Sequence, residues 1–239
     1  MNDPRLSVII PAYNEADRIG STLTAYLAYL NKQSYRFEII VVDDGSKDGT
    51  TDVVRNSFPG VQVIGYYPNR GKGHAVRTGL QAAAGAFRLF SDADASTPIE
   101  EIEKFWPCFE RGAEVVIGSR SLPESDVEVH QAWYREGMGR VFNAMVRALR
   151  LSDFTDTQCG FKAFTANACE VILPRQTIDG FAFDAEMLYI ASKHNLRIEQ
   201  VPVHWINSPK SRVNPITDSS AMIGEIVGIR VRDWRGAYD

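Results

Sequence analysis

The stretch Phe87-Arg-Leu-Phe-Ser-Asp-Ala-Asp94 joins a short apolar run to two carboxylates. The run Phe87–Ser91 has the length and apolar content of a strand buried in a sheet. Asp92 and Asp94 stand where the apolar pattern stops, and hard oxygen ligands of this kind suit Mg²⁺ or Mn²⁺, which usually also bind substrate phosphates. Aspartate is equally common in solvated turns, so the pair taken alone leaves a plain strand-end turn open.

Similar apolar runs occur on both sides of this stretch, separated by segments of helical periodicity. Strands are expected at 6–10, 37–42, 61–66, 87–91 and 114–119, and helices at 17–30, from residue 50, at 73–84 and at 99–110. Short apolar runs that alternate with helices predict an α/β protein with a mostly parallel sheet covered on both faces.

Polar clusters follow the predicted strands. They are Tyr13-Asn-Glu15, Asp43-Asp44, 69–72, and Asp92 with Asp94. Ligands of open α/β sheets bind at the carboxyl ends of the strands, and this coincidence is the main argument for a site.

Two of these loops have specific chemistry. Asp43 or Asp44 can accept hydrogen bonds from a base or ribose, while Asp48 or Thr50 suits the cap of the next helix. The segment 69–73, Asn-Arg-Gly-Lys-Gly, offers backbone donors and the Lys72 cation near a helix N-terminus, which suits a phosphate. It is neither a Walker A loop nor a dinucleotide fingerprint, and by itself it also fits a simple turn.

Size and composition indicate one domain. The 239 residues carry a formal net charge of −4, with 44% hydrophobic and 23% charged residues, which argues against general nucleic-acid binding. The three cysteines form no CxxC pair, and neither a signal peptide nor a run of roughly 18 apolar residues is present in the sequence, so a cytoplasmic location is expected.

Five segments together resemble glycosyltransferase family 2, whose members have the GT-A fold. They are Pro11-Ala-Tyr-Asn-Glu15, 42–50 (Val-Asp-Asp-Gly-Ser-Lys-Asp-Gly-Thr), 69–73, Asp92-Ala-Asp94 and Gly118-Ser-Arg120. The resemblance implies a single GT-A domain over 1–239, with a nucleotide-sugar-binding half at 1–120, and an acceptor half at 121–239 that adds helices and strands.

The resemblance also implies roles for individual residues. Pro11, Ala12, Tyr13, Glu15, Asp43, Asp44, Lys72 and Asp92 would bind the nucleotide sugar. Asp92 and Asp94 would hold Mg²⁺ or Mn²⁺ with the donor diphosphate, and the choice between the two metals stays open.

The second half resembles the dolichyl-phosphate β-glucosyltransferase branch. Similar segments are Asp156-Thr-Gln-Cys-Gly-Phe-Lys162, 181–187 (Phe-Ala-Phe-Asp-Ala-Glu-Met), Val203-His-Trp205 and 208–211. This branch implies inverting transfer of glucose from UDP-glucose to a polyprenyl or dolichyl phosphate. The alternatives are a GDP-mannose donor and a soluble hydroxyl acceptor.

The acceptor sets the remaining requirements. A phosphate monoester is largely ionised at pH 7, so it needs no general base, and arginines offset its repulsion from the donor. The candidates are Arg120, Arg135 and Arg212. A hydroxyl acceptor would need a base, for which Asp184 and Glu186 are candidates, although acidic residues also favour helix N-termini.

In the second half, helices are expected at 133–151, 183–194 and 219–234, and strands at 161–164 and 198–205. Residues 140–151 form a basic amphipathic pattern after Trp133 and Tyr134, which fits either a peripheral contact with the cytoplasmic face of a membrane or ordinary core packing. Residues 219–234 fit packing, membrane contact or a dimer interface, and the oligomeric state stays open.

Two other classes of protein compete with a glycosyltransferase. A nucleotidyltransferase typically has a Gly-rich, Arg-bearing loop after the first strand, where this chain has Pro11–Glu15. A non-catalytic sugar-binding module could lose its metal carboxylates, yet Asp92 and Asp94 are both present.

Overall fold

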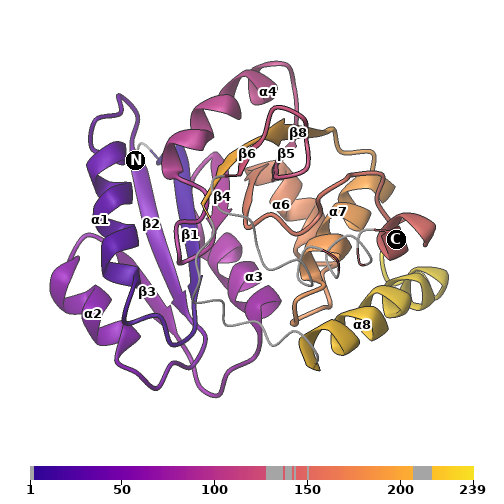
Figure 1. Ribbon diagram of the computed structural model, residues 1–239, viewed down its shortest axis with the longest axis horizontal. Coiled ribbons are helices and arrows are strands. Elements are labelled where there is room, and N and C mark those ends of the chain that lie inside the picture. Colours follow the sequence, from indigo (N-terminus) through magenta and orange to yellow (C-terminus); the bar gives the residue numbers. More distant parts are fainter. Residues whose placement is uncertain (1–2, 128–136, 138–141, 143, 150, 207–216) are drawn as a thin grey trace.

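A central sheet organises the molecule, as the computed structural model shows for residues 3–127, 137, 142, 144–149, 151–206 and 217–239 (Figure 1). It is seven-stranded, with the order β3-β2-β1-β4-β7-β5-β8. The strands are β1 (Leu6–Ala12), β2 (Phe37–Asp43), β3 (Gln62–Gly65), β4 (Phe87–Ser91), β5 (Val115–Ser119), β7 (Phe161–Thr165) and β8 (Ile198–Pro202). A separate small sheet pairs β6 (Asp126–Val127) with β9 (His204–Trp205).

Most strand pairs are parallel. β1 runs parallel to β2 on one side and to β4 on the other, and β5 runs parallel to β8. β7 is antiparallel to both β4 and β5, between which it lies. The prediction of a mostly parallel α/β sheet is therefore confirmed. Because β7 and β8 come from the second half, the predicted halves share one sheet, and their division at residue 120 stays a prediction.

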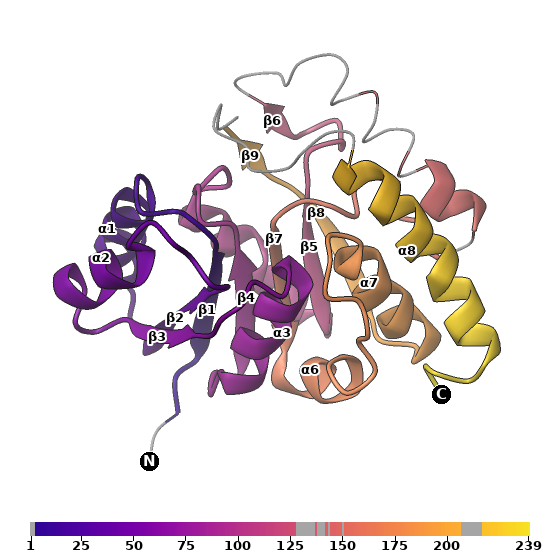
Figure 2. The same cartoon turned by 90° about the horizontal axis from the view of Figure 1, so that it is seen from below.

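Helices cover both faces of the sheet, as Figure 2 shows. On one side lie α1 (Ile19–Leu30), α2 (Thr50–Ser57), the 3-10 helix η1 (Ile99–Lys104) and α4 (Trp106–Glu110). On the other lie α3 (Lys72–Ala82), α6 (Ala166–Ile172), α7 (Phe183–Lys193) and α8 (Thr217–Trp234).

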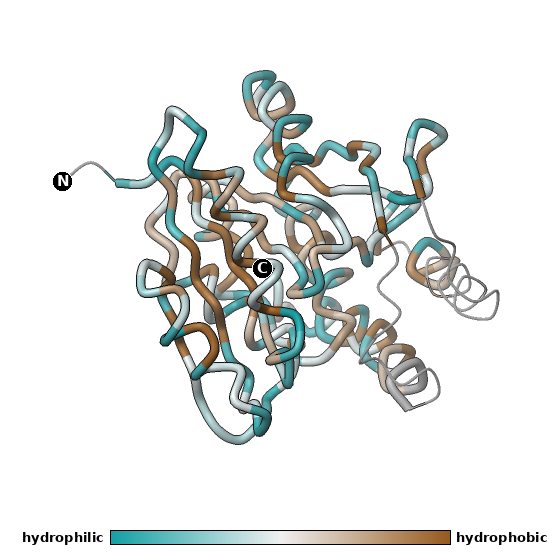
Figure 3. Tube along the Cα trace, turned by 60° about the vertical axis from the view of Figure 1, so that its left-hand side comes forward, coloured by the Kyte–Doolittle hydropathy of each residue, from teal (hydrophilic) through white to brown (hydrophobic). Residues whose placement is uncertain are grey.

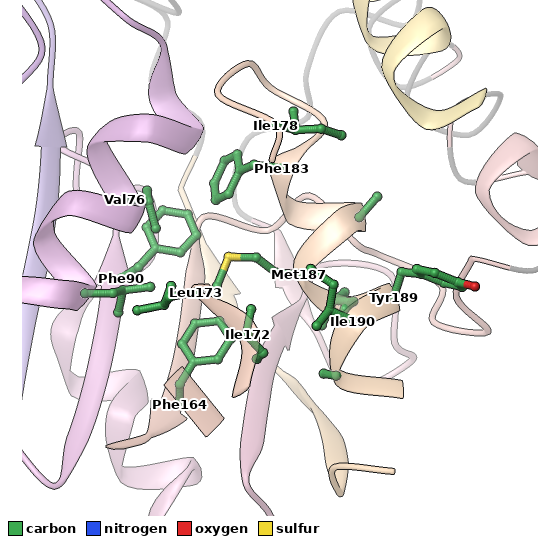
Figure 4. Packing of buried hydrophobic residues seen from close by; sticks show 14 of the residues in the cluster. Val76, Phe90, Phe164, Ile172, Leu173, Ile178, Phe183, Met187, Tyr189 and Ile190 are labelled. Carbon is green, nitrogen blue, oxygen red and sulfur yellow. The ribbon is translucent and has the colours of Figure 1, made fainter. Parts of the chain in front are cut away.

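Each face of the sheet has its own core, because successive side chains of a strand point to opposite faces. In β1, Val8 and Ile10 join the core under α1, whereas Ile9 joins the core under α3 and α7. Figure 3 shows the central strands as hydrophobic and the loops at their ends as more hydrophilic. Figure 4 shows Phe90 and Phe183 in the second core, with ring centroids 5.7 Å apart.

Local breaks account for the main differences from the predicted elements. The helix expected at 99–110 divides into η1 and α4, since Pro107 has no N–H to donate and is tolerated only in a first turn. The strand expected at 198–205 leaves the main sheet after Pro202 and continues as β9 in the second sheet. Helix α6 was not predicted, although Thr165 caps it by accepting a hydrogen bond from the Ala168 N–H.

The helix expected at 133–151 falls largely outside the described residues. Those described at 144–148 are helical, and Val146 is buried in the core. Trp133, Tyr134 and most of the basic residues of that pattern are not among them.

Candidate active site

A cleft of about 370 Å³ opens at the carboxyl ends of β1 and β4. Strand order reverses between these neighbours, since β2 and β3 lie beyond β1 on the far side, and such switch points are where open α/β sheets bind ligands. The cleft is lined by Pro11, Ala12, Tyr13, Glu15, Arg18, Asp44, Asn69, Gly71, Lys72, Ala75, Asp92, Ala93, Asp94, Gly180 and Phe181. The structure thus brings together the predicted nucleotide-sugar residues, Asp43 excepted.

Asp92 and Asp94 leave β4 into the cleft. The Asp92 N–H donates to the Gly160 carbonyl oxygen at 3.1 Å, and Asp94 Oδ1 accepts from the Ser96 N–H at 3.0 Å. The Asp92 carboxylate packs so tightly on Gly160 that a Cβ there would lie 2.0 Å from Asp92 Oδ2. Gly160 therefore holds the orientation of the first metal candidate.

The two carboxylates fit a divalent cation that shares its shell with a substrate. Asp92 Oδ1 is buried and receives no hydrogen bond of ordinary geometry, and its close partner is the Lys72 ammonium 2.6 Å away. The described residues contain no group of three His, Cys, Asp or Glu side chains that could hold a metal. Mg²⁺ and similar ions commonly bind one or two carboxylates and take the other ligands from phosphates and water. Asp92 and Asp94 match that pattern.

Lys72, the first residue of α3, touches the candidate metal residue itself. Its side chain is a quarter exposed. Burial lowers the pKa of Lys72, but the nearby Asp92 and Asp184 carboxylates raise it more, so the ammonium stays charged. The predicted phosphate ligand is thus paired with the carboxylate predicted to hold the metal.

The loop after β1 is tied to the loop after β2. Asn14 adopts a left-handed φ of 56°, and its N–H donates to Ser46 Oγ at 2.9 Å. The Glu15 N–H donates to Thr50 Oγ1 at 2.8 Å, and the Ala16 N–H donates to Asp48 Oδ2 at 3.0 Å. The residues expected to cap α2 therefore also position the Pro11–Glu15 segment.

The carboxylates of Asp43 and Asp44 both organise loops. Asp43 accepts from the Ser46 N–H at 2.8 Å and from the Thr51 hydroxyl, and it does not line the cleft. Asp44 does line the cleft, yet its oxygens accept from Asn69 Nδ2, the Arg70 N–H and the Gly71 N–H at 2.8, 2.7 and 2.9 Å. A role in nucleotide binding stays a prediction for both.

Arg18 is a cleft residue that sequence reasoning missed. Its Nη2 donates to Glu15 Oε1 at 2.7 Å, and its Nη1 lies 3.7 Å from Asp94 Oδ2. The guanidinium therefore links the Pro11–Glu15 segment to the Asp92/Asp94 pair. The available signal was the spacing of three residues from Glu15 at a helix start, where such pairs meet.

The segment 156–162 supports the cleft from behind. Asp156 accepts from Arg120 Nε and Nη2 at 2.8 and 2.9 Å. Burial by itself raises the pKa of Asp156, but the Arg120 guanidinium outweighs burial and brings it to about 2. Since two of its nitrogens bind Asp156 and it does not line the cleft, Arg120 anchors this segment to β5. Its contact with an acceptor phosphate stays a prediction.

The buried Lys162 completes this support. Its Nζ donates to the Cys159 carbonyl oxygen at 2.6 Å and to Asp184 Oδ1 at 2.5 Å. Asp184 is 5% exposed, and its burial raises its pKa against the opposing effect of Lys162. Asp184 is therefore the counter-ion of Lys162 behind the cleft, and its predicted catalytic role gains no support from this position.

Glu186 does not line the cleft, and its predicted role as a base gains no support from its position. It is fully buried, and its oxygens accept from the Thr177 N–H and hydroxyl, the Ile178 N–H and the Tyr238 hydroxyl. These bonds fasten the loop before α7 to the C-terminus. The other two predicted acceptor arginines, Arg135 and Arg212, lie outside the described residues.

The same loop forms one wall of the cleft through Gly180 and Phe181. It packs on the start of α3 so closely that a Cβ on Gly71, whose φ is 108°, would lie 2.4 Å from the Asp179 carbonyl oxygen. From the other side, Glu225 of α8 accepts from the Ala182 N–H at 3.1 Å. Sequence reasoning missed this wall, because nothing local marks residues 176–182 as close to Lys72.

Sequence comparison agrees with the cleft and the fold. Residues 7–173 match the profile of Glycosyl transferase family 2. A dolichyl-phosphate beta-glucosyltransferase of Dictyostelium discoideum is 36% identical over an alignment of 248 residues that covers 98% of this chain and 76% of that protein. The Homo sapiens protein of the same name is 33% identical over an alignment of 253 residues that covers 98% of this chain and 77% of that protein. The chain belongs to glycosyl transferase family 2, as its motifs predicted.

Solved structures of the GT-A type share the fold. Glucosyl-3-phosphoglycerate synthase from Mycobacterium tuberculosis, in complex with UDP, has a TM-score of 0.69 at 21% identity, covering 95% of this chain and 80% of its own. Mannosyl-3-phosphoglycerate synthase from Rubrobacter xylanophilus has a TM-score of 0.71 at 21% identity, covering 96% and 74%. At this identity the likeness defines the architecture alone.

Proposed function

We propose that this glycosyltransferase moves glucose from UDP-glucose to the phosphate of a polyprenol of the dolichyl type, with inversion at the anomeric carbon. The bond from the anomeric carbon to the UDP β-phosphate breaks, a bond to an acceptor phosphate oxygen forms, and UDP leaves. The name and the coverage of the 36% identical relative support glucose and the lipid phosphate. A structural neighbour that binds UDP-glucose with Mn²⁺ makes the uridine donor the first to test.

The chemistry of the cleft suits departure of a diphosphate. Asp92 and Asp94 would hold Mg²⁺ or Mn²⁺, which when bound neutralises the charge that develops on the leaving UDP. Lys72 adds a flexible ammonium at the start of α3, where phosphate oxygens are favoured. Arg18 keeps Asp94 close to the Pro11–Glu15 segment, so the diphosphate and nucleoside ends of the site are held in register.

The observation that carries the choice of acceptor is the state of the carboxylates in the cleft. Among the described residues, those lining it are Glu15, Asp44, Asp92 and Asp94. Each is already engaged by a cation or by N–H donors. A hydroxyl acceptor needs a base to remove its proton, whereas a phosphate monoester arrives ionised. The cleft therefore favours a phosphate acceptor.

Thermal shift measurements test the donor. Mn²⁺ with UDP-glucose should raise the melting temperature, because a ligand bound only by the native state stabilises it. Mn²⁺ with GDP-mannose serves as the matched comparison, and a rise with the guanosine donor alone would move the proposal to mannose transfer.

Transfer assays test the acceptor. Radiolabelled glucose should appear in the organic phase with dolichyl phosphate, and not with dolichol, which has the same chain and no phosphate. 3-Phosphoglycerate is the soluble phosphate comparison. Glucose transfer to it, with none to the lipid, would reject the lipid acceptor. Because 3-phosphoglycerate also carries a hydroxyl, the linkage in that product would then decide between a hydroxyl and a phosphate as the acceptor group.

A contact with the surface of a phospholipid membrane, from the cytoplasmic side, completes the proposal. The large exposed apolar residues of α8 are Ile223, Val227, Val231 and Trp234, with exposed fractions of 41%, 45%, 40% and 90%. Their spacing puts them on one stripe, at whose end lies the exposed Arg235. Tryptophan and arginine suit the interface of an anionic membrane. Glu225, on another side of the same helix, accepts a hydrogen bond from Ala182 next to the cleft wall.

Flotation with vesicles tests this contact. No helix among the described residues is long and apolar enough to span a membrane. Vesicles with 30% anionic lipid should carry the wild-type protein upward at roughly 0.1 M salt, and Val227→Asp with Trp234→Ala should reduce that fraction severalfold. A second copy of the chain as occupant would instead appear as a dimer that these substitutions dissociate.

A further inference from the structure

Lys72 occupies the position at Asp92 that a cation would take. Its Nζ lies 2.6 Å from Asp92 Oδ1, the buried oxygen that receives no ordinary hydrogen bond. An ammonium and a divalent cation at this distance from one oxygen repel each other, so they compete for it. A metal should therefore bind Asp92 Oδ1 more tightly when Lys72 withdraws.

Lys72 is also the partner that can move. Asp92 is confined, since its Oδ2 packs against the backbone of Gly160 and its N–H bonds to the Gly160 carbonyl. Both side chains are partly exposed, 25% for Lys72 and 34% for Asp92, but only Lys72 has a flexible four-carbon stem, and it borders the cleft directly. The Lys72 ammonium lies 5.4 Å from the Phe90 ring centroid, as does that of Lys162.

Among the residues that the structure describes, Lys72 has few other anionic partners nearby. Asp184, the next carboxylate acting on Lys72, is already bonded to Lys162 at 2.5 Å. Asp94 binds the Ser96 N–H and faces Arg18. A diphosphate entering the cleft brings new oxygens close to both Lys72 and Asp92, which line the same cavity.

We propose that Lys72 is an internal stand-in for the metal: it neutralises Asp92 in the unliganded enzyme and transfers to the donor diphosphate, which releases Asp92 to a divalent cation. This inference rests on the proposed function. Its consequence is that metal affinity is low without the nucleotide and rises when the diphosphate engages Lys72. The enzyme then binds metal and donor as one unit.

Two separate titrations test the exchange. Mn²⁺ alone is titrated into wild type and into Lys72→Met, with unbound Mn²⁺ followed by electron paramagnetic resonance. UDP alone is titrated calorimetrically in the presence of EDTA. Lys72→Met should bind Mn²⁺ about tenfold tighter and UDP about tenfold weaker, in the range of coupled binding equilibria. The opposite signs distinguish exchange from other roles of Lys72.

Other roles of Lys72 predict other combinations of the Mn²⁺ and UDP affinities of Lys72→Met. A lysine that only binds phosphate would weaken UDP and leave Mn²⁺ unchanged, and a lysine that only supports the fold would weaken both. Either pair overturns the proposal. Lys32→Met, an exposed lysine at the end of α1, is the control for net charge and should change neither affinity. Adding Asp92→Asn to Lys72→Met should remove the gain in Mn²⁺ affinity.

Failure of the proposed function would look different. If wild type with Mn²⁺ bound neither UDP nor UDP-glucose, the donor assignment would fall. The Mn²⁺ titration of Lys72→Met would still report whether Lys72 competes at Asp92.

Discussion

At the residue scale, the chemistry depends on where Asp92 and Asp94 point. Asp94 reaches the cleft through a turn closed by its own bond to the Ser96 N–H, followed at Ala95 by a left-handed φ of 49°. Asp92 is held by Gly160, which comes from a distant part of the chain. One carboxylate is thus oriented locally and the other by tertiary contact.

Asp94→Ala should reduce kcat by a factor of about 100 or more, because it removes a ligand of the cation that stabilises the leaving diphosphate. The melting temperature should hardly change, since Asp94 is partly exposed. Steady-state kinetics with saturating UDP-glucose give the test, and Asp52→Asn on the exposed side of α2 is the control. Full activity of the Asp94 variant would reject the metal role.

Gly160→Ala should lose most activity although it adds a single methyl group. The new Cβ would lie 2.0 Å from Asp92 Oδ2, so the carboxylate or the backbone must shift. Misplacement of a catalytic group by about 1 Å costs on the order of 100-fold in rate. Gly60→Ala is the matched control, since a Cβ there meets nothing within 4 Å. Equal activities of the two variants would contradict the packing argument.

At the scale of elements, the antiparallel strand β7 brings the supporting residues of the site next to the cleft. β7 enters between β4 and β5, and the segment before it, 156–160, passes behind Asp92. Lys162 in β7 and Asp184 in α7 then pair under the cleft floor. This pair joins the sheet to the helix whose preceding loop forms the cleft wall.

Lys162→Met should destabilise the protein by about 3–5 kcal/mol, because it leaves the Asp184 carboxylate buried without its counter-ion. The combination with Asp184→Asn should cost less than the two single changes added together, since the pair is lost as a unit. Urea unfolding followed by circular dichroism measures both. Lys104→Met, which breaks the more exposed pair with Glu101, should cost less than about 1 kcal/mol. Strict additivity would refute the coupling.

At the scale of the whole molecule, stability should depend on acid through the Arg120–Asp156 pair. The pKa of Asp156 is about 2 in the folded protein, against an ordinary value of 3.8 for an aspartate. A carboxyl group whose pKa is lower in the folded protein than in the unfolded chain stabilises the fold fully at pH values above its unfolded pKa. That contribution is lost as pH falls from about 4 to about 2. The shift corresponds to about 2 kcal/mol of unfolding free energy.

Urea unfolding between pH 5 and pH 2.5 measures this contribution. Asp156→Asn should be less stable than wild type at pH 5 and should lose less further stability on acidification. Asp126→Asn, an exposed carboxylate on β6, should keep the wild-type slope. An unchanged slope in Asp156→Asn would show that other carboxyls carry the acid sensitivity.

The sequence by itself determined the layered α/β architecture and the end of the sheet that carries the site. A strand that is buried on both faces must be a continuous apolar run, so it is visible in the local sequence, as at Phe87–Ser91. The polar residues that end such runs, Asp92 and Asp44 among them, are visible there too. The family motifs lie on those same loops, which is why most of the predicted nucleotide-sugar residues meet in one cleft.

The partners of the charged residues were decided by the tertiary structure alone. Lys72 binds Asp92, Arg120 binds Asp156, and Lys162 binds Asp184, each across a long stretch of chain. Such pairs depend on strand order and register, above all on the antiparallel insertion of β7. The sequence of an apolar strand does not show whether it pairs in parallel or antiparallel with its neighbours. A charge in a sequence shows that a partner is needed, and only the folded packing, by setting distance and burial, selects it.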